Sequence, residues 1–167
     1  FFIYTGIFEK VGTELEIYRD FRSRKFDGFD NFFALFLEKV ATIFHTEKLN
    51  HLKAQAAKFL SEHQVYTKND RIYRYLRDVV LSSSQYKQIM ESMMADAGYF
   101  AHKYFENLFM NEKEVLDLAN RSHCIGLHSH SHPTMIQDLD ILEQKQEYIQ
   151  NLKILNSILN IQLKAMS

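Results

Sequence analysis

The chain is poor in residues that cross-link or interrupt a fold: its 167 residues include one cysteine, one proline and five glycines. A single cysteine excludes an intramolecular disulfide. Because Cys124 lies in a short apolar run, we expect its thiol to be buried and unreactive. This sparse use of cysteine favours a reducing compartment, and therefore a cytoplasmic location.

Long apolar runs and an excess of charge are also missing. No run approaches the ~20 apolar residues of a membrane-spanning helix, so we predict no transmembrane segment. The formal net charge of −1 excludes bulk electrostatic attraction to nucleic acid or to an anionic membrane, and we expect no nucleic-acid partner. The chain opens at Phe1 without a methionine and closes at Ser167, each time as if within a strand. We expect both ends to be cut from a longer protein.

The middle of the chain has a strong helical pattern, which its few glycines and single proline leave uninterrupted. Apolar residues recur there at spacings of three and four: Phe29, Phe32, Phe33, Phe36, Leu37, Val40, Ile43 and Phe44. We predict that residues 30–107 form a helical insertion within a single, partial domain spanning 1–167. We expect this insertion to pack as a lid or side domain beside the strands.

The flanking segments favour strands that alternate with helices. Residues 1–5 and 124–127 are short apolar runs, typical of buried strands. A helix is predicted to begin at Asn111, whose spacing from Glu114 matches a capping box. A long helix from Ile141 and a final strand follow. This order is typical of parallel winding, and the sequence therefore predicts the α/β fold class.

Three of the eight histidines lie within five residues, directly after the predicted strand 124–127: His128, His130 and His132. Neutral imidazole is a common ligand of catalytic metals, and α/β folds place their chemistry at the carboxyl ends of strands. If the chain turns after His128, both His128 and His132 can bind one cation, with ring nitrogens roughly 3–4 Å apart. The competing interpretation is a surface loop with incidental histidines.

The residues between those two histidines have a supporting role in this hypothesis. If the rings of His128 and His132 both point at the metal, the ring of His130 points away from it. We therefore expect His130 to lie behind the metal ligands or at the rim of the site, and not to bind the metal. Ser129 and Ser131 can hydrogen-bond the loop or a ligand ring and so fix its orientation.

The stretch Gly126-Leu127-His128-Ser129-His130-Ser131-His132-Pro133 resembles the second motif of the polysaccharide deacetylases, carbohydrate esterases that share a distorted (β/α) barrel. That motif has histidine, serine or threonine, two variable residues, histidine and commonly proline. The resemblance extends to residues 109–126 before the motif, to the first strand, and to residues 165–167, where the strand of the third motif would begin. It implies a partial barrel with a large helical insertion.

This resemblance also implies a chemistry. His128 and His132 would be two ligands of a divalent metal, with zinc expected and cobalt or nickel as alternatives. The third ligand and the general base would come from an Asp-Asp pair before Phe1, and a late histidine beyond Ser167 would be the acid. The implied reaction removes acetyl groups from an amino sugar or acetylated glycan in bacterial surface polysaccharide metabolism. The 167-residue chain alone is expected to be inactive.

Two other functions remain open, and the sequence predicts no oligomeric state. His128-Ser129-His130 also satisfies the His-x-His pattern of amidohydrolase-like metal hydrolases. A catalytically inactive module that binds a glycan or another protein is the third interpretation. An Asp-Asp pair upstream of Phe1 would favour the deacetylase. Elsewhere, three evenly spaced arginines favour a solvated, ion-paired helix face over a phosphate site: Arg71, Arg74 and Arg77.

Overall fold

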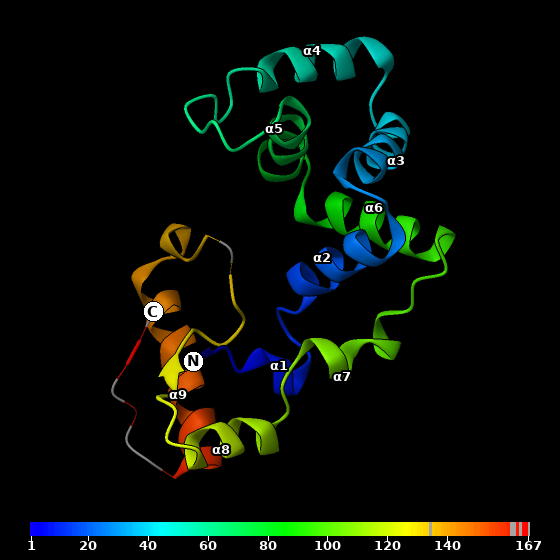
Figure 1. Cartoon of the computed structure of the whole chain (residues 1–167). Helices are drawn as coiled ribbons and strands as arrows, with labels where there is room; N and C mark the ends of the chain where they lie inside the picture. Colours follow the sequence, from blue (N-terminus) through cyan, green and yellow to red (C-terminus); the bar gives the residue numbers. More distant parts are fainter. Residues whose placement is uncertain (134, 161–162, 164, 167) are drawn as a thin grey trace. The chain divides into compact units, whose positions relative to one another are not determined.

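The computed structural model describes residues 1–133, 135–160, 163 and 165–166. The chain is mostly helical, with 65% of residues in helices and 3% in strands (Figure 1). Its elements in order are β1 (Phe2–Ile3), α1 (Gly6–Glu9), α2 (Glu14–Lys25), α3 (Phe29–Ala41), α4 (Thr46–Ala56), α5 (Lys68–Tyr75), the π-helix η1 (Leu76–Val80), α6 (Ser83–Asp96), η2 (Ala101–Lys103), α7 (Phe105–Leu108), α8 (Glu112–Asn120), β2 (Gly126–Leu127), η3 (Ile136–Asp138) and α9 (Ile141–Leu159).

The predicted α/β barrel fold is wrong. Strands β1 and β2 do pair in parallel, but over two residues each, and Leu127 adds a single parallel bridge to Met166. A (β/α) barrel needs a closed ring of parallel strands. The part of the chain that the structure describes contains only this two-stranded sheet. The apolar runs at 1–5 and 124–127 were therefore too short a signal from which to infer a complete sheet.

Cys124 departs from its prediction as well. The second strand begins at Gly126, two residues later than expected, and the Cys124 side chain is exposed. The Cys124 carbonyl accepts a hydrogen bond from the amino group of Phe1 at 2.7 Å. Of the terminal strand expected from Leu163, the residues Lys164 and Ser167 lie outside the described part of the chain.

Side-chain caps explain where α5, α6, α8 and α9 begin. The predicted capping box at Asn111 is present: its side chain accepts from the Glu114 amide, and the Glu114 carboxylate accepts from the Asn111 amide. The same reciprocal pair starts α9 at Asp140 and Glu143. The helical prediction for residues 30–107 is also confirmed, since every element between Phe29 and Leu108 is a helix.

The chain divides into two compact units, formed by residues 1–17 with 101–167 and by residues 18–100. Unit 2 (residues 18–100) has an aromatic core, because the phenylalanines of α3 repeat on one helix face. Phe32 and Phe36 are at most 1% exposed, and the ring of Tyr73 from α5 meets both edge-on.

Unit 1, formed by the two terminal segments, packs α8 and α9 around the short sheet. Its core is aliphatic, with Ile3 of β1, Val115 of α8 and Leu155 of α9 all at most 3% exposed. Since β1 and β2 are parallel neighbours, this core holds Tyr4 and Thr5 beside the residues that follow Leu127.

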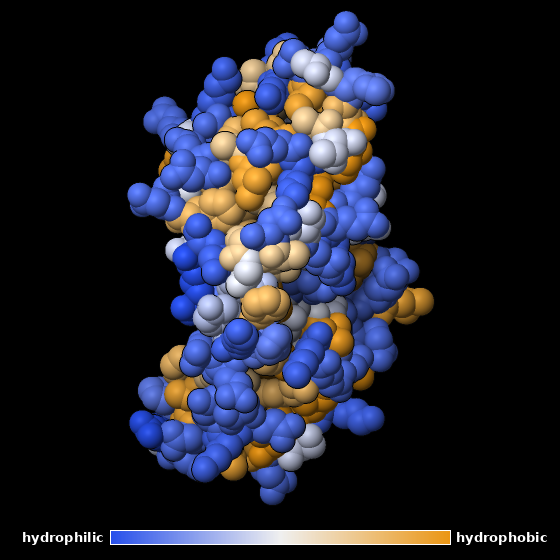
Figure 2. Space-filling view, turned by 90° about the vertical axis from the view of Figure 1, so that its right-hand side faces the viewer, coloured by the Kyte–Doolittle hydropathy of each residue, from blue (hydrophilic) through white to orange (hydrophobic). Residues whose placement is uncertain are grey.

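Hydrophilic side chains cover most of the face seen in Figure 2, and apolar side chains appear between them in separate groups. Within the described ranges, no helix combines the length and the apolar character that crossing a bilayer requires.

Candidate functional site

The histidine loop, residues 128–132, leaves β2 and is anchored at its start by a buried asparagine of α9. Asn151 is fully buried, and its Oδ1 accepts from the His128 amide at 3.1 Å. Its Nδ2 donates to the Ile3 carbonyl at 2.9 Å and to Thr5 Oγ1 at 3.2 Å. One amide side chain therefore connects the end of β1, the end of β2 and α9.

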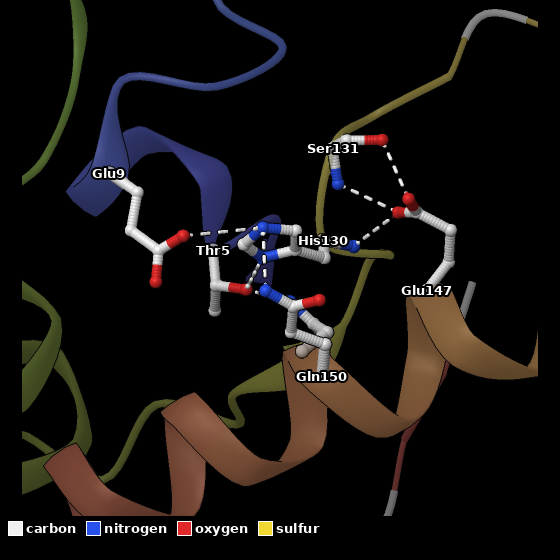
Figure 3. Close-up of polar contacts among 7 residues, drawn as sticks. Thr5, Glu9, His130, Ser131, Glu147 and Gln150 are labelled. Atoms are coloured by element: carbon white, nitrogen blue, oxygen red, sulfur yellow. Dashed lines mark hydrogen bonds and ion pairs between the residues drawn. The ribbon is translucent and has the colours of Figure 1, made fainter.

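A carboxylate holds the middle of the histidine loop. Glu147 Oε2 accepts from the backbone amides of His130 at 2.8 Å and Ser131 at 2.7 Å, and Oε1 accepts from Ser131 Oγ at 2.7 Å (Figure 3). Burial raises the pKa of Glu147, but the hydrogen bonds from Ser131 and His130 outweigh it and hold the pKa below its ordinary value. The ionised carboxylate thus stabilises this loop conformation.

The His130 ring lies inside unit 1 and is 7% exposed. Its Nδ1 lies 3.0 Å from Thr5 Oγ1, and its Nε2 lies 3.0 Å from Gln150 Nε2 and 3.5 Å from Glu9 Oε2 (Figure 3). Both ring nitrogens therefore already have partners within the protein. To bind a metal, His130 would have to give up at least one of them.

The other two histidines lie side by side. The ring centroids of His128 and His132 are 5.0 Å apart, with the ring planes inclined by 45°. Two imidazoles that share one tetrahedral cation through ~2.1 Å bonds have centroids on the order of 5 Å apart. The spacing of the two rings therefore matches the two-histidine part of a metal site.

His132 is also packed against residues that precede the loop by more than a hundred positions. The Tyr4 ring stacks on His132, with centroids 4.6 Å apart and planes 21° from parallel. Glu16 Oε1 lies 3.9 Å from His132 Nδ1, and Glu16 Oε2 accepts from the Tyr4 hydroxyl at 3.5 Å. Burial and then the Glu16 and Glu14 carboxylates raise the pKa of the Tyr4 phenol well above its ordinary value, so Tyr4 is a neutral donor.

The backbone of the loop is strained and fits closely against the chain near α1. Ser129 and His132 have φ angles of 61° and 53°, in the left-handed region. The amide of Gly6 donates to the His130 carbonyl at 2.7 Å. A Cβ at Gly12 would lie 1.8 Å from the Ser131 carbonyl oxygen, so only glycine permits this approach.

Two histidines alone do not complete a metal centre. Over residues 1–133, 135–160, 163 and 165–166, no group of three or more His, Cys, Asp or Glu side chains is arranged to hold a metal. Glu16 faces Nδ1 of His132, with its Oε1 at 3.9 Å.

Sequence reasoning named the loop residues but missed the side chains that surround them: Tyr4, Thr5, Glu16, Glu147, Gln150 and Asn151. Their only local signal was the pair of glycines at Gly6 and Gly12, which permits close approach of another backbone. Arg74 of α5 and Arg77 of η1 lie apart from the loop in sequence and have local partners. Arg77 binds the carboxylate of Asp78 at 2.5 and 2.8 Å, and Arg74 stacks 4.3 Å from the Tyr66 ring.

Comparison of the chain with protein-family models, with curated proteins and with solved structures finds no match.

Proposed function

We propose that His128 and His132 are two ligands of a divalent metal, zinc being expected, in a hydrolase that removes acetyl groups from a carbohydrate. The observation that supports this most is the 5.0 Å separation of the two ring centroids, within a loop that has two left-handed residues. Strained backbone of this kind clusters at functional sites. The proposal does not depend on a barrel, because it uses only the loop and its neighbours.

The resemblance to the polysaccharide deacetylases supplies the substrate class. A divalent cation at this site supplies a Lewis acid, which polarises an acetyl carbonyl and increases the acidity of water. The residues of this chain bind and orient: His128 and His132 donate their ring nitrogens, while Glu147 and Asn151 fix the backbone between and before them. The sequence contains no Asp-Asp pair, so the general base of the resemblance has no counterpart in residues 1–167.

The partners of His130 favour this function over an amidohydrolase-like one. An amidohydrolase-like site would use His128 and His130 as its His-x-His pair. However, His130 is buried and its ring nitrogens lie 3.0 Å from Thr5 Oγ1 and Gln150 Nε2. Ligation through Nδ1 would leave the buried Thr5 hydroxyl without this partner, at a cost of about 1–3 kcal/mol, and ligation through Nε2 would displace the half-buried Gln150 amide.

Zinc titration of the purified chain tests the proposal, with binding measured by calorimetry. We expect one zinc site that His128→Ala and His132→Ala each weaken at least tenfold, since each removes a direct ligand. His51→Ala is the matched control, because His51 is exposed on α4 in unit 2. Equal zinc affinity in all four proteins would refute the metal site. When His128→Ala and His132→Ala are made in the full-length gene product, acetate release from acetylated sugars should fall in parallel with zinc affinity.

A further inference from the structure

The first turn of α2 brings a carboxylate to the candidate metal pair from a part of the sequence that no histidine motif includes. Glu16 is the third residue of α2, and its side chain is 25% exposed. Its two oxygens face different groups: Oε1 lies 3.9 Å from His132 Nδ1, and Oε2 accepts from the Tyr4 hydroxyl. Glu16 is therefore placed on the Nδ1 side of the His132 ring.

The side of the ring matters because the two nitrogens of an imidazole are not equivalent. In a neutral histidine one nitrogen carries hydrogen and the other offers a lone pair, and only the lone pair can bind a metal. A carboxylate is an acceptor, so it favours the tautomer with hydrogen on the nitrogen that it faces. Beside Glu16, His132 would keep hydrogen on Nδ1 and offer Nε2 as the ligand.

Tyr4 restricts the remaining freedom of the same ring. It stacks on the face of His132 at a centroid distance of 4.6 Å, and its own ring is held edge-on by Phe109 at 6.5 Å. Stacking fixes the plane of the imidazole. Glu16 then lies on the edge that carries Nδ1 and not on the edge that carries Nε2. Tyr4 directly follows β1, so the sheet that places the histidine loop also places this ring.

We infer that Glu16 is a positioning residue for the metal site: it holds the Nδ1 edge of His132, so that Nε2 is presented to the cation beside His128. This inference rests on the proposed function, but names a residue and a ring nitrogen that the motif resemblance does not assign. The 3.9 Å separation is longer than a hydrogen bond. We expect it to shorten when the metal binds, as hydrogen bonds at active sites often do on complex formation.

The test follows the histidine side chains by NMR, through the long-range coupling of ring nitrogens to ring protons, which identifies the tautomer directly. Spectra are recorded at pH 7.5 without metal and during titration with zinc chloride. The variants are Glu16→Leu, which removes the acceptor at similar size, and Glu16→Gln, whose amide oxygen still accepts. Glu112→Leu is the matched control, because Glu112 is an exposed carboxylate in the first turn of α8, another helix of unit 1.

We expect the unchanged chain and Glu112→Leu to have His132 mainly with hydrogen on Nδ1, and zinc to shift the Nε2 resonance. In Glu16→Leu the tautomers should become mixed and zinc affinity should fall about tenfold, the usual scale for groups behind a ligand. Glu16→Gln should have a tautomer ratio and a zinc affinity between those of the unchanged chain and those of Glu16→Leu. An unchanged tautomer and zinc affinity in Glu16→Leu would overturn the inference.

Failure of the proposed function would give a different result. If zinc leaves the His128 and His132 resonances of the unchanged chain in place, the metal site itself is refuted. If zinc shifts both resonances in the unchanged chain and equally in Glu16→Leu, the site stands and the role of Glu16 is refuted.

Discussion

Ser129 and His132 have left-handed backbone conformations, although neither is glycine. Each such residue costs on the order of 1–3 kcal/mol and persists only where its surroundings over-determine it. The surroundings are specific: Glu147 holds the two amides between these residues, and Gly6 donates to the carbonyl of His130. The same backbone conformation places the His132 ring beside the His128 ring. The loop therefore depends on contacts that a substitution can remove one at a time.

Gly12→Ala should disrupt the loop by steric clash. A Cβ at Gly12 would lie 1.8 Å from the Ser131 carbonyl oxygen, and the φ of 67° disfavours alanine as well. We expect a loss of roughly 2–4 kcal/mol in the free energy of unfolding, measured by urea denaturation. Gly98→Ala is the matched control, since Gly98 has a φ of 59° and no atom within 4 Å of its Cβ position. It should cost only about 1 kcal/mol. Equal losses for the two variants would show that the Ser131 contact has no role.

Glu147→Gln should weaken the anchor of the loop and remove part of its pH dependence. The amide keeps the shape but loses the charge that accepts three hydrogen bonds, so we expect a loss of about 1–2 kcal/mol at pH 7. Because folding lowers the pKa of Glu147, the ionised carboxylate adds to the free energy of unfolding. This contribution is fully present above the unfolded-state pKa. That contribution is lost as the pH falls through the lower folded-state pKa.

Urea denaturation from pH 7 down to pH 3 measures both effects. The difference in stability between the unchanged chain and Glu147→Gln should narrow as the solution becomes more acidic. A difference that stays constant across this range would contradict the account of the Glu147 charge.

At the scale of elements, the sequence predicted helices better than strands. The spacing of Phe32 and Phe36 and the capping pair at Asn111 are local patterns, and local hydrogen bonds and packing realise them. A strand is defined by its partner instead, and residues 124–127 carry no information on how many partners exist. This is why the parallel pairing was predicted correctly, whereas the predictions of a barrel and of a buried Cys124 were wrong.

The candidate site shows the same limit. His128 and His132 are four residues apart, so their sequence spacing is visible in the motif. Glu16 and Glu147 reach the loop only through the fold, from α2 and α9, and their distance along the chain hides the relationship. Sequence reasoning could therefore name the histidines but not the groups that orient them.

Asn151→Leu should show how far one side chain holds the elements together. Leucine has a similar volume, but it leaves the His128 amide, the Ile3 carbonyl and the Thr5 hydroxyl without their shared partner inside unit 1. Unsatisfied buried groups predict a loss of roughly 3 kcal/mol in the free energy of unfolding. Hydrogen exchange of the His128 amide, which donates to Asn151 Oδ1, should accelerate with it. Unchanged exchange at this amide would show that Asn151 does not join β2 to α9.

At the scale of the whole molecule, the two compact units have separate cores of different composition. Unit 2 is built around aromatic rings, whereas unit 1 is built around aliphatic side chains of the sheet, α8 and α9. The histidine loop and the contacts described for it belong to unit 1. Its geometry should therefore depend on the core of unit 1 rather than on that of unit 2.

Phe36→Ala tests this separation. Phe36 is fully buried in unit 2, and its removal should cost about 3–5 kcal/mol in the stability of that unit. We expect the NMR signals of His128, His130 and His132 to keep their positions at a temperature where unit 2 has begun to unfold. If the signals of these histidines are lost together with the signals of unit 2, the two units fold as one.

X-ray diffraction from zinc-soaked crystals of this chain, with data collected on both sides of the zinc absorption edge, tests the metal site most directly. We expect an anomalous peak about 2.1 Å from one ring nitrogen each of His128 and His132, with His130 still bound to Thr5 and Gln150. A peak on His130, or zinc at other residues with the His128–His132 pair left vacant at saturating zinc, would contradict the proposed metal site.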